Sequence, residues 1–231
     1  MNIKKGQNTR QTILDSARQI FNERGLNITL EKIAAEMGLT KSRITNHFAT
    51  KESLFLAILR DYEESLARCA TDIGLSDALE LSELAVGISA VMDVQYQYRC
   101  GMAYVAMVTH SQQELHRHIS ENYRKNVRSI LKRTEKMVDA GILKPEILKS
   151  SDFSIFVFQY TNILTTWVIN LELYDIEQGY AKMKPVYISA AFSCFIPYLT
   201  KKGEKQLAAI DFRQASKSSK TQKARTSDSL N

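Results

Sequence analysis

Residues 30–48 read LEKIAAEMGLTKSRITNHF, and this stretch decides the fold of the N-terminal region. Ala34 is small enough for two helices to cross closely, and Gly38 supplies a turn conformation that a residue with a Cβ resists. The spacing predicts a helix-turn-helix, in which two short helices meet at a sharp turn and pack on a preceding helix. The apolar side chains expected to bury the pair are Ile33, Met37, Leu39 and Ile44.

The second helix of this motif leaves short polar or cationic side chains exposed and no acid. Such a face suits the major groove of DNA, and Arg43, Thr45 and Asn46 can reach base edges. The alternative is a small helical hairpin whose polar face is merely solvated. Further predicted DNA contacts, chiefly to phosphate through cations or helix N-termini, are Thr29, Thr40, Lys41, Ser42, His47 and Lys51.

The segments on either side complete a small helical domain. Residues 9–24 place apolar side chains at the spacing of an amphipathic helix, and Gly25 is suited to end it. Thr50 can cap a fourth helix over about residues 51–68. The DNA-binding domain is therefore expected over residues 1–50.

Residues 10–60 resemble the N-terminal domain of the TetR family of regulators. The family pattern usually has Tyr after the position of Ile44, whereas this chain has Thr45 followed by Asn46. Either an aromatic phosphate contact is missing, or base readout shifts to these two side chains. The matching residues are Thr12-Ile13-Leu14, Phe21, Gly25, Ile33-Ala34, Gly38, Ile44, Phe48 and Lys51-Glu52-Ser53-Leu54.

Composition and charge agree with an all-α protein that meets a phosphate-rich partner at one end. Gly (9) and Pro (3) are scarce among 231 residues, and 44% of the residues are hydrophobic. Residues 1–60 carry ten Lys/Arg against five Asp/Glu, residues 61–212 sixteen against nineteen, and residues 213–231 five against one. A basic module on a near-neutral body favours nucleic acid as the partner of that module.

Several function classes find little support. Cys69, Cys100 and Cys194 have no metal or disulfide spacing, which favours free, mostly buried thiols over a redox sensor. His116 and His118, with nearby acids, point around an exposed helix and make a metal site improbable. No secretory signal, membrane span, phosphate loop or nucleophile elbow is visible, so we expect a cytoplasmic bacterial protein without cofactor, metal or enzymatic activity.

The remainder should form a larger helical domain over residues 51–210, giving an all-α fold of about nine helices. Helices are expected over residues 76–92, 111–138, 150–173 and 185–199, the last opened by Pro185 with Pro197 disturbing its final turn. The Lys/Arg-rich segment 124–136 is interpreted as a solvated helix face. Residues 211–231 are predicted to be a disordered basic tail.

The family resemblance implies that this domain dimerises through its last two long helices and often holds a ligand. Met and aromatic side chains could line a pocket for an apolar or amphipathic effector, although for any single one of them plain core packing is the favoured explanation. The pocket candidates are Tyr104, Met107, Val108, His110, Tyr123, Phe156, Tyr160, Leu164 and Trp167. The candidates for the dimer interface are Ile155, Phe158, Asn162, Thr165, Ile188, Ala191, Phe192 and Phe195.

The sequence thus predicts a homodimeric, ligand-responsive repressor that binds a near-palindromic double-stranded operator. The alternative is an activator or architectural DNA-binding protein without a small-molecule inducer, in which the basic tail adds non-specific affinity.

Overall fold

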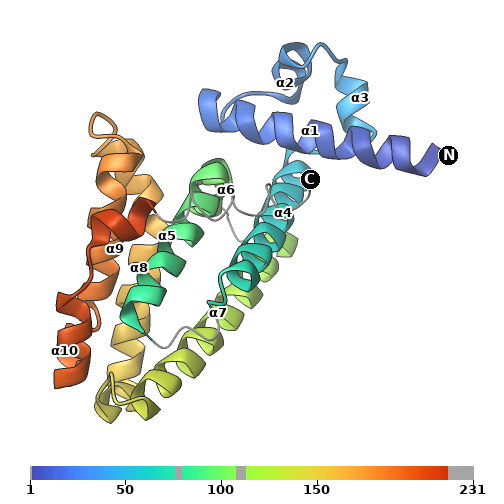
Figure 1. Ribbon diagram of the computed structural model, residues 1–231. Helices are drawn as coiled ribbons and strands as arrows, with labels where there is room; N and C mark the ends of the chain where they lie inside the picture. The colour runs from blue at the N-terminus through green and yellow to red at the C-terminus, as the bar shows by residue number, and fades with distance from the viewer. Residues whose placement is uncertain (1, 76–79, 108–112, 218–231) are drawn as a thin grey trace, which may run out of the picture. The chain divides into compact units, whose positions relative to one another are not determined.

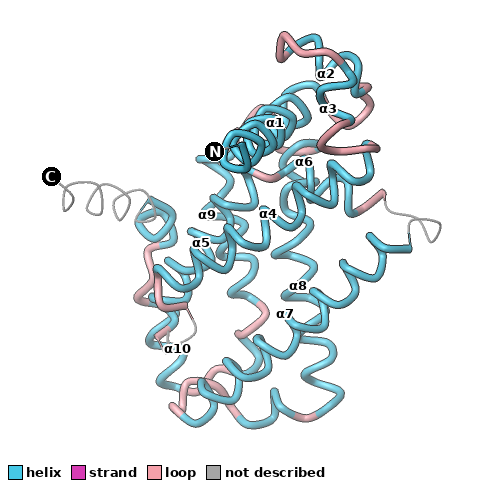
Figure 2. The backbone as a smooth tube through the Cα atoms, turned by 90° about the vertical axis from the view of Figure 1, so that its right-hand side faces the viewer, coloured by secondary structure: helices cyan, strands magenta, loops and turns pink. Residues whose placement is uncertain are grey.

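The computed structural model describes residues 2–75, 80–107 and 113–217, with side chains from residue 9 onward. Every named element in this part of the chain is a helix, joined to the next by loops (Figure 2), which confirms the all-α prediction. Among the described residues, no helix is both long enough and apolar enough to cross a membrane. The chain divides into two compact units, residues 1–65 with 95–116 (unit 1) and residues 66–94 with 117–231 (unit 2).

Unit 1 contains the predicted helix-turn-helix. In Figure 1, α2 and α3 lie on one side of α1, the long blue helix at the N-terminus. The apolar side chains of these helices converge: Ile33 and Ile44 are fully buried, and the rings of Phe21 and Phe55 lie 4.4 Å apart between centroids. The helices that contribute to unit 1 are α1 (Asn2–Arg24), α2 (Leu30–Glu36), α3 (Lys41–Thr45), the first part of α4 (Lys51–Asp72) and α6 (Arg99–Val105).

Local chemistry explains why α2 and α3 begin and end where they do. The Thr29 hydroxyl accepts a hydrogen bond from the backbone N–H of Lys32, and the Thr40 hydroxyl accepts one from that of Arg43. Each cap satisfies an N–H that has no partner within the helix. Between the two helices Gly38 has φ +65°, a backbone conformation that side chains with a Cβ rarely adopt.

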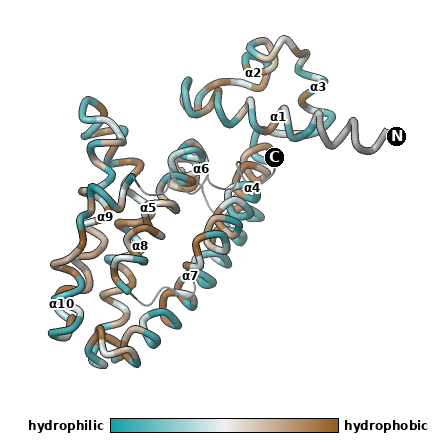
Figure 3. Tube along the Cα trace, in the orientation of Figure 1, coloured by the Kyte–Doolittle hydropathy of each residue, from teal (hydrophilic) through white to brown (hydrophobic). Residues whose placement is uncertain are grey.

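Unit 2 is held together by aromatic side chains on α8 and α9. Trp167 is 1% exposed and packs against the rings of Tyr180 and Tyr187, at centroid distances of 5.3 and 5.7 Å. Apolar residues predominate along α8, whereas α10 is mostly hydrophilic (Figure 3). The elements of unit 2 are the first part of α5 (Leu81–Gln97), most of α7 (Gln113–Asp139), η1 (Pro145–Leu148), α8 (Ser150–Leu173), α9 (Tyr180–Ser193), η2 (Ile196–Tyr198) and α10 (Lys201–Ala208).

Several predicted boundaries are wrong. The first helix begins at Asn2 instead of Thr9, and the helix predicted over residues 76–92 spans Leu81–Gln97. Pro185 lies inside α9, which begins five residues earlier, because Gly179 with φ +76° provides the turn that precedes the helix. The last long helix ends at Ser193, and Pro197 lies in the separate 3₁₀ turn η2.

The predicted disordered tail begins with ordered chain. Residues 212–217 are helical, and the Phe212 ring contacts the Phe192 ring at a centroid distance of 5.3 Å. Ala215 is 8% exposed, so this short segment belongs to the packing of unit 2. The rest of the predicted tail, residues 218–231, lies outside the described residues.

Candidate nucleic-acid interface

The exposed face of α3 is the candidate interface, and its geometry follows from the single buried residue of the helix. Ile44 is fully buried against α1 and α2, so the residues on either side of it turn outward. Within Lys41–Thr45 and the following Asn46 there is no acidic residue. Of the residues predicted to contact DNA here, Lys41, Ser42, Arg43 and Asn46 are exposed, and Thr45 and His47 are half-buried.

Hydroxyl groups on this face are held by local hydrogen bonds. The Thr45 hydroxyl donates to the backbone carbonyl of Ser42 at 3.3 Å, and the Thr40 and Ser42 hydroxyls lie 3.0 Å apart. Arg43 has no such tether on its side chain among the described contacts, and it lies at the edge of a cavity of about 590 Å³ between α1 and the α2–α3 turn. A guanidinium at this position is available for a base edge or a phosphate.

Lys41 is not a free cation. Its ammonium forms an ion pair with Glu31 on α2, and both side chains are more than half exposed. The side-chain hydrogen bond from Lys41 lowers the pKa of the Glu31 carboxyl. A phosphate contact by Lys41 would therefore exchange one anionic partner for another, and its net contribution to binding is reduced.

Lys51, predicted to contact phosphate, is occupied within the protein. Its ammonium donates a hydrogen bond to the backbone carbonyl of Leu26 and lies 5.6 Å from the centroid of the Phe21 ring. Burial lowers the pKa of this half-buried ammonium. The side chain links the start of α4 to the loop after α1. It thereby supplies a hydrogen-bond donor to a loop carbonyl, which has no partner within a helix. Its role in the structure is internal, and the sequence gives no sign of the carbonyl that it binds.

Arg10 is a cation near this face that the sequence reading missed. Its guanidinium carbon lies 4.7 Å from the centroid of the Phe48 ring, and the side chain is exposed. Phe48 lies in the loop that follows α3. Arg10 on α1 therefore places a positive charge beside α3. Arg10 lies on the polar face of the amphipathic pattern over residues 9–24, and this position is the signal in the sequence that could have identified it.

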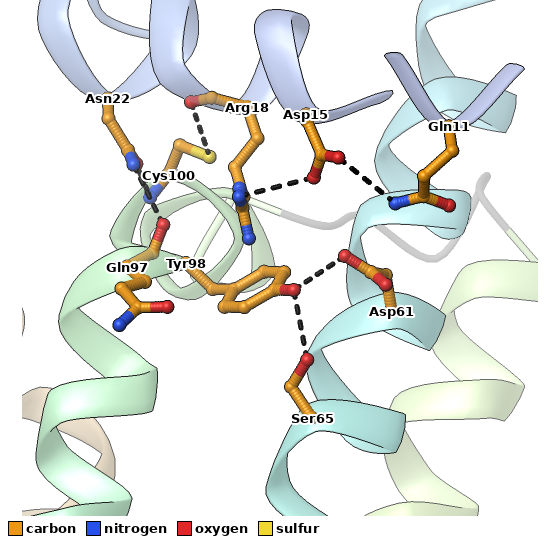
Figure 4. Close-up of polar contacts among 9 residues, drawn as sticks. All are labelled: Gln11, Asp15, Arg18, Asn22, Asp61, Ser65, Gln97, Tyr98 and Cys100. Atoms are coloured by element: carbon orange, nitrogen blue, oxygen red, sulfur yellow. Dashed lines mark hydrogen bonds and ion pairs between the residues drawn. The ribbon is translucent and has the colours of Figure 1, made fainter. Parts of the chain in front are cut away.

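A polar joint connects α1, α4 and the break between α5 and α6, all within unit 1 (Figure 4). The Asn22 side-chain amide donates to the Gln97 carbonyl at 2.8 Å and accepts from the Cys100 backbone N–H at 2.9 Å. The Tyr98 hydroxyl donates to the Asp61 carboxylate at 2.5 Å. These contacts, which we call the α1–α6 joint, fix the helix that follows α5 directly to the helix on which α2 and α3 pack.

Two further features of the joint are a cation over the Tyr98 ring and a buried thiol at Cys100. The Arg18 guanidinium carbon lies 4.3 Å from the centroid of the Tyr98 ring, and Arg18 in turn pairs with Asp15 at 3.2 Å. Burial raises the pKa of the Cys100 thiol to about 12, which keeps it neutral and unreactive. Cys194 is buried as well, Cys69 is half-buried, and no disulfide joins any of the three cysteines within the described residues.

The predicted pocket residues are not gathered at one described cavity. Tyr104 belongs to unit 1 and stacks on Phe55 at a centroid distance of 3.9 Å, while Met107 and Tyr123 are 59% and 50% exposed. In unit 2, Phe156, Tyr160 and Trp167 are buried in aromatic packing, and Leu164 is half-buried. Val108 and His110 lie outside the described residues.

The predicted dimer residues divide into two groups. Ile155 and Phe158 on α8 are 59% and 65% exposed, and Asn162 and Thr165 on the same face are exposed. The candidates on α9 are instead part of the core: Ile188, Ala191, Phe192 and Phe195 are 0%, 0%, 1% and 3% exposed. Their assignment to an interface is wrong, because the wholly apolar pattern of this segment does not show which side faces its own unit. The outward side of the segment carries Val186, Ser189, Ser193 and Ile196.

The arrangement defines an all-helical protein with an N-terminal helix-turn-helix, and comparison with known proteins agrees. Residues 13–58 match the family described as bacterial regulatory proteins, tetR family. The HTH-type transcriptional repressor AcnR of Corynebacterium efficiens is 31% identical over 113 residues, 47% of this chain and 60% of that protein. The HTH-type transcriptional regulator UidR of Escherichia coli is 38% identical over 66 residues, 28% of this chain and 34% of that protein. In both cases the match covers less than two thirds of the relative.

Solved structures share the fold over nearly the whole chain. A TetR-family transcriptional regulator from Marinobacter aquaeolei has a TM-score of 0.74 at 22% identity, covering 89% of this chain and 98% of that one. The SmeT–triclosan complex has a TM-score of 0.60 at 18% identity, covering 84% and 92%. Residues 13–58 thus resemble the DNA-binding part of the TetR family, and the solved structures show that the whole chain shares the fold of TetR-family regulators.

Proposed function

We propose that the protein is a transcriptional repressor that binds double-stranded DNA through α3. The observation that carries this proposal is the exposed, acid-free face of α3, with Arg43 and Asn46 projecting from a helix that two threonine-capped turns hold in place. Polar and cationic side chains on a short rigid helix are what a major groove accepts. The repressor names of the AcnR relatives support the direction of the effect.

The proposed DNA-bound form is a homodimer, so that two copies of α3 read a near-palindromic operator. The apolar outward face of α8, together with the outward side of α9, supports this assembly, because large exposed apolar side chains in one patch need a partner. A second chain on these two helices would bury Ile155, Phe158 and Val186.

The regulation proposed for this repressor is release by a small organic effector. The α1–α6 joint supports it, because any displacement of the start of α6 would pull on Asn22 and on the helix that carries α2 and α3. A ligand needs only a few kcal/mol of preference for the displaced state to shift the population. An activator or architectural role without effector is the second candidate, favoured by the five Lys/Arg of residues 213–231.

The test uses the full chain and a duplex selected by it from a random library. The double variant Arg43→Ala/Asn46→Ala should lose at least tenfold affinity for that duplex, because it removes the base-reading side chains from α3. Lys205→Ala on α10 removes an exposed cation of unit 2 and serves as the matched control, with unchanged affinity. Unchanged affinity of the α3 double variant would end the proposal.

The salt dependence of DNA affinity distinguishes the second candidate, in which the basic tail contributes to binding, from the proposed repressor. Truncation after Phe212 removes all five Lys/Arg of the tail, namely Arg213 and the four that follow it. If the tail supplies non-specific affinity, the slope of log affinity against log salt becomes shallower. An unchanged slope removes the tail from DNA binding.

A further inference from the structure

Most of the cations described in the first 65 residues are already engaged within the protein. Eight Lys/Arg side chains are described over residues 9–65, and five of them pair with a carboxylate or donate to a carbonyl. Within the described part of the chain, Arg10, Lys32 and Arg43 have neither kind of contact. A cation that exchanges no existing partner contributes most to phosphate binding. The five engaged residues are Arg18, Arg24, Lys41, Lys51 and Arg60.

Arg10 differs from the other two because its charged group is held beside an aromatic ring. Its guanidinium carbon lies 4.7 Å from the centroid of the Phe48 ring, while the side chain as a whole is exposed. Phe48 is 2% exposed, and its backbone N–H donates to the Ile44 carbonyl at 2.9 Å. The ring is therefore fixed to the end of α3, and the Arg10 guanidinium is positioned next to that end.

The same turn of α1 meets α3 at a second place. Thr9 and Thr12 line the cavity of about 590 Å³ that has Arg43 at its edge. Residues 9–12 therefore lie beside α3 itself as well as beside the loop that follows it. Figure 1 shows the same arrangement, with α3 next to the half of α1 that is nearer the N-terminus. Any duplex that α3 enters comes close to this turn of α1.

The dimensions of DNA show what a cation beside α3 would meet. A helix with its side chains is about 10–12 Å across, and the major groove is about 12 Å wide. A helix in the groove thus fills it, so a charged group just beside the helix faces the phosphates of the groove wall. Thr45 near the end of α3 is short, and its hydroxyl donates to the Ser42 carbonyl. A longer side chain from α1 is better placed to reach those phosphates.

We infer that Arg10 is a DNA-backbone contact, and that its guanidinium, held against Phe48, binds a phosphate of the strand that borders α3. The planar guanidinium can bind phosphate oxygens through two parallel charge-assisted hydrogen bonds. Because every base pair carries the same phosphates, Arg10 positions α3 in the groove and reads no sequence. The inference rests on the proposed DNA binding through α3 and adds a contact from a second helix.

A salt series on the full-length protein tests this contact with two duplexes, the selected one and one of unrelated sequence. Arg10→Met should weaken binding to both by the same factor, roughly fivefold or more at 0.1 M salt. The slope of log affinity against log salt should become shallower by about 0.9 for each bound subunit. Arg24→Met is the matched control, because it removes the same charge about 21 Å further along α1. It should leave affinity and slope nearly unchanged.

Two further measurements separate a phosphate contact from a structural role. Arg10→Lys keeps the charge without the planar group, so it should keep the salt slope and recover part of the affinity that Arg10→Met loses. Thermal unfolding without DNA should change by about 4 °C at most in Arg10→Met, since an exposed cation over a ring contributes little to stability. A large fall in the midpoint, with no recovery in Arg10→Lys, would make Arg10 a structural residue and contradict the inference.

Three DNA-binding results would also overturn the inference. They are an unchanged salt slope in Arg10→Met, an equal loss in the Arg24→Met control, and a loss confined to the selected duplex, which would make Arg10 a base contact. The α3 double variant separates this failure from that of the proposed function. If Arg43→Ala/Asn46→Ala loses affinity while Arg10→Met keeps it, DNA binding through α3 stands and only the contact from α1 is wrong. If the double variant keeps its affinity, the proposed function itself fails.

Discussion

The helices α3 and α8 both leave a conspicuous face exposed, but the two faces differ in kind. On α3 the exposed side chains are polar or cationic and cover one buried isoleucine, Ile44. On α8 the exposed face includes Ile155 and Phe158, although its opposite face is already buried through Phe156 and Trp167. A polar face suits a hydrated, charged partner, whereas an apolar face on a helix already buried on its other side suits another protein surface.

The largest effect is expected on the inward face of α8. Trp167→Ala should destabilise the protein by about 3–5 kcal/mol, because it leaves a large cavity beside Tyr180 and Tyr187. Urea unfolding of the variant measures this loss. Phe158→Ala, on the outward face of the same helix, is the contrast and should cost much less when unfolding is measured at low protein concentration. Equal losses at both positions would show that the outward face is not free in the single chain.

A charge on the outward face of α8 is expected to have the next largest effect. Phe158→Asp should weaken self-association by about 2 kcal/mol or more, since it puts a carboxylate into an apolar interface. Sedimentation equilibrium measures the dissociation constant. Asn126→Asp adds the same charge on the exposed face of α7 and should leave association unchanged. If Phe158→Asp associates as the unaltered chain does, the two copies meet elsewhere.

Single changes on α3 should have smaller and different effects. Arg43→Ala should cost about 1–3 kcal/mol on the selected duplex and relax its sequence preference, as expected for a base contact. Lys41→Ala should weaken binding to all duplexes alike and reduce the salt slope by about one at most, because Glu31 already pairs with this lysine. Fluorescence anisotropy over a salt series distinguishes the two. If Arg43→Ala weakened binding to all duplexes alike and Lys41→Ala relaxed the sequence preference, Lys41 would be the base contact and Arg43 the phosphate contact.

The smallest effect at neutral pH concerns Tyr160, on the inward face of α8. Its pKa in the folded protein is raised by burial from 10.0 to about 12, so the folded state holds the proton more tightly. This contribution to stability is fully present below pH 10 and is lost as the pH rises from 10 through 12. Urea unfolding across this range should show a shallower decline for Tyr160→Phe than for the unaltered chain. Tyr174→Phe, 77% exposed, is the control.

The sequence predicted α3 well because its determinants are local. Thr29 and Thr40 cap their helices, and Gly38 makes the turn, as expected from residues a few positions apart. The internal contact of Lys51 was not predicted, because its partner, the Leu26 carbonyl, is a backbone atom that any residue would provide. A pattern within one segment cannot show a contact of that kind.

The α8–α9 region was harder to predict for a related reason. A segment that is apolar all round, such as residues 185–199, reveals that it is buried but not which side packs on its own chain. Phe192 and Phe195 were therefore predicted to lie at the dimer interface, and the structure places them in the core. On α7, segment 124–136 was predicted to be a solvated face, yet Arg133 within it is half-buried. The exposed cations around this residue dominate the sequence pattern and hide the exception.

The central claim is that two copies of α3 read DNA as a pair. Selection of duplexes by the full-length protein from a random library tests it most directly. We expect an inverted repeat whose half-sites lie about 10 base pairs apart or at a multiple of that spacing, as two recognition helices on a two-fold axis require. No enriched sequence, or an enriched site without inverted symmetry, would contradict the account.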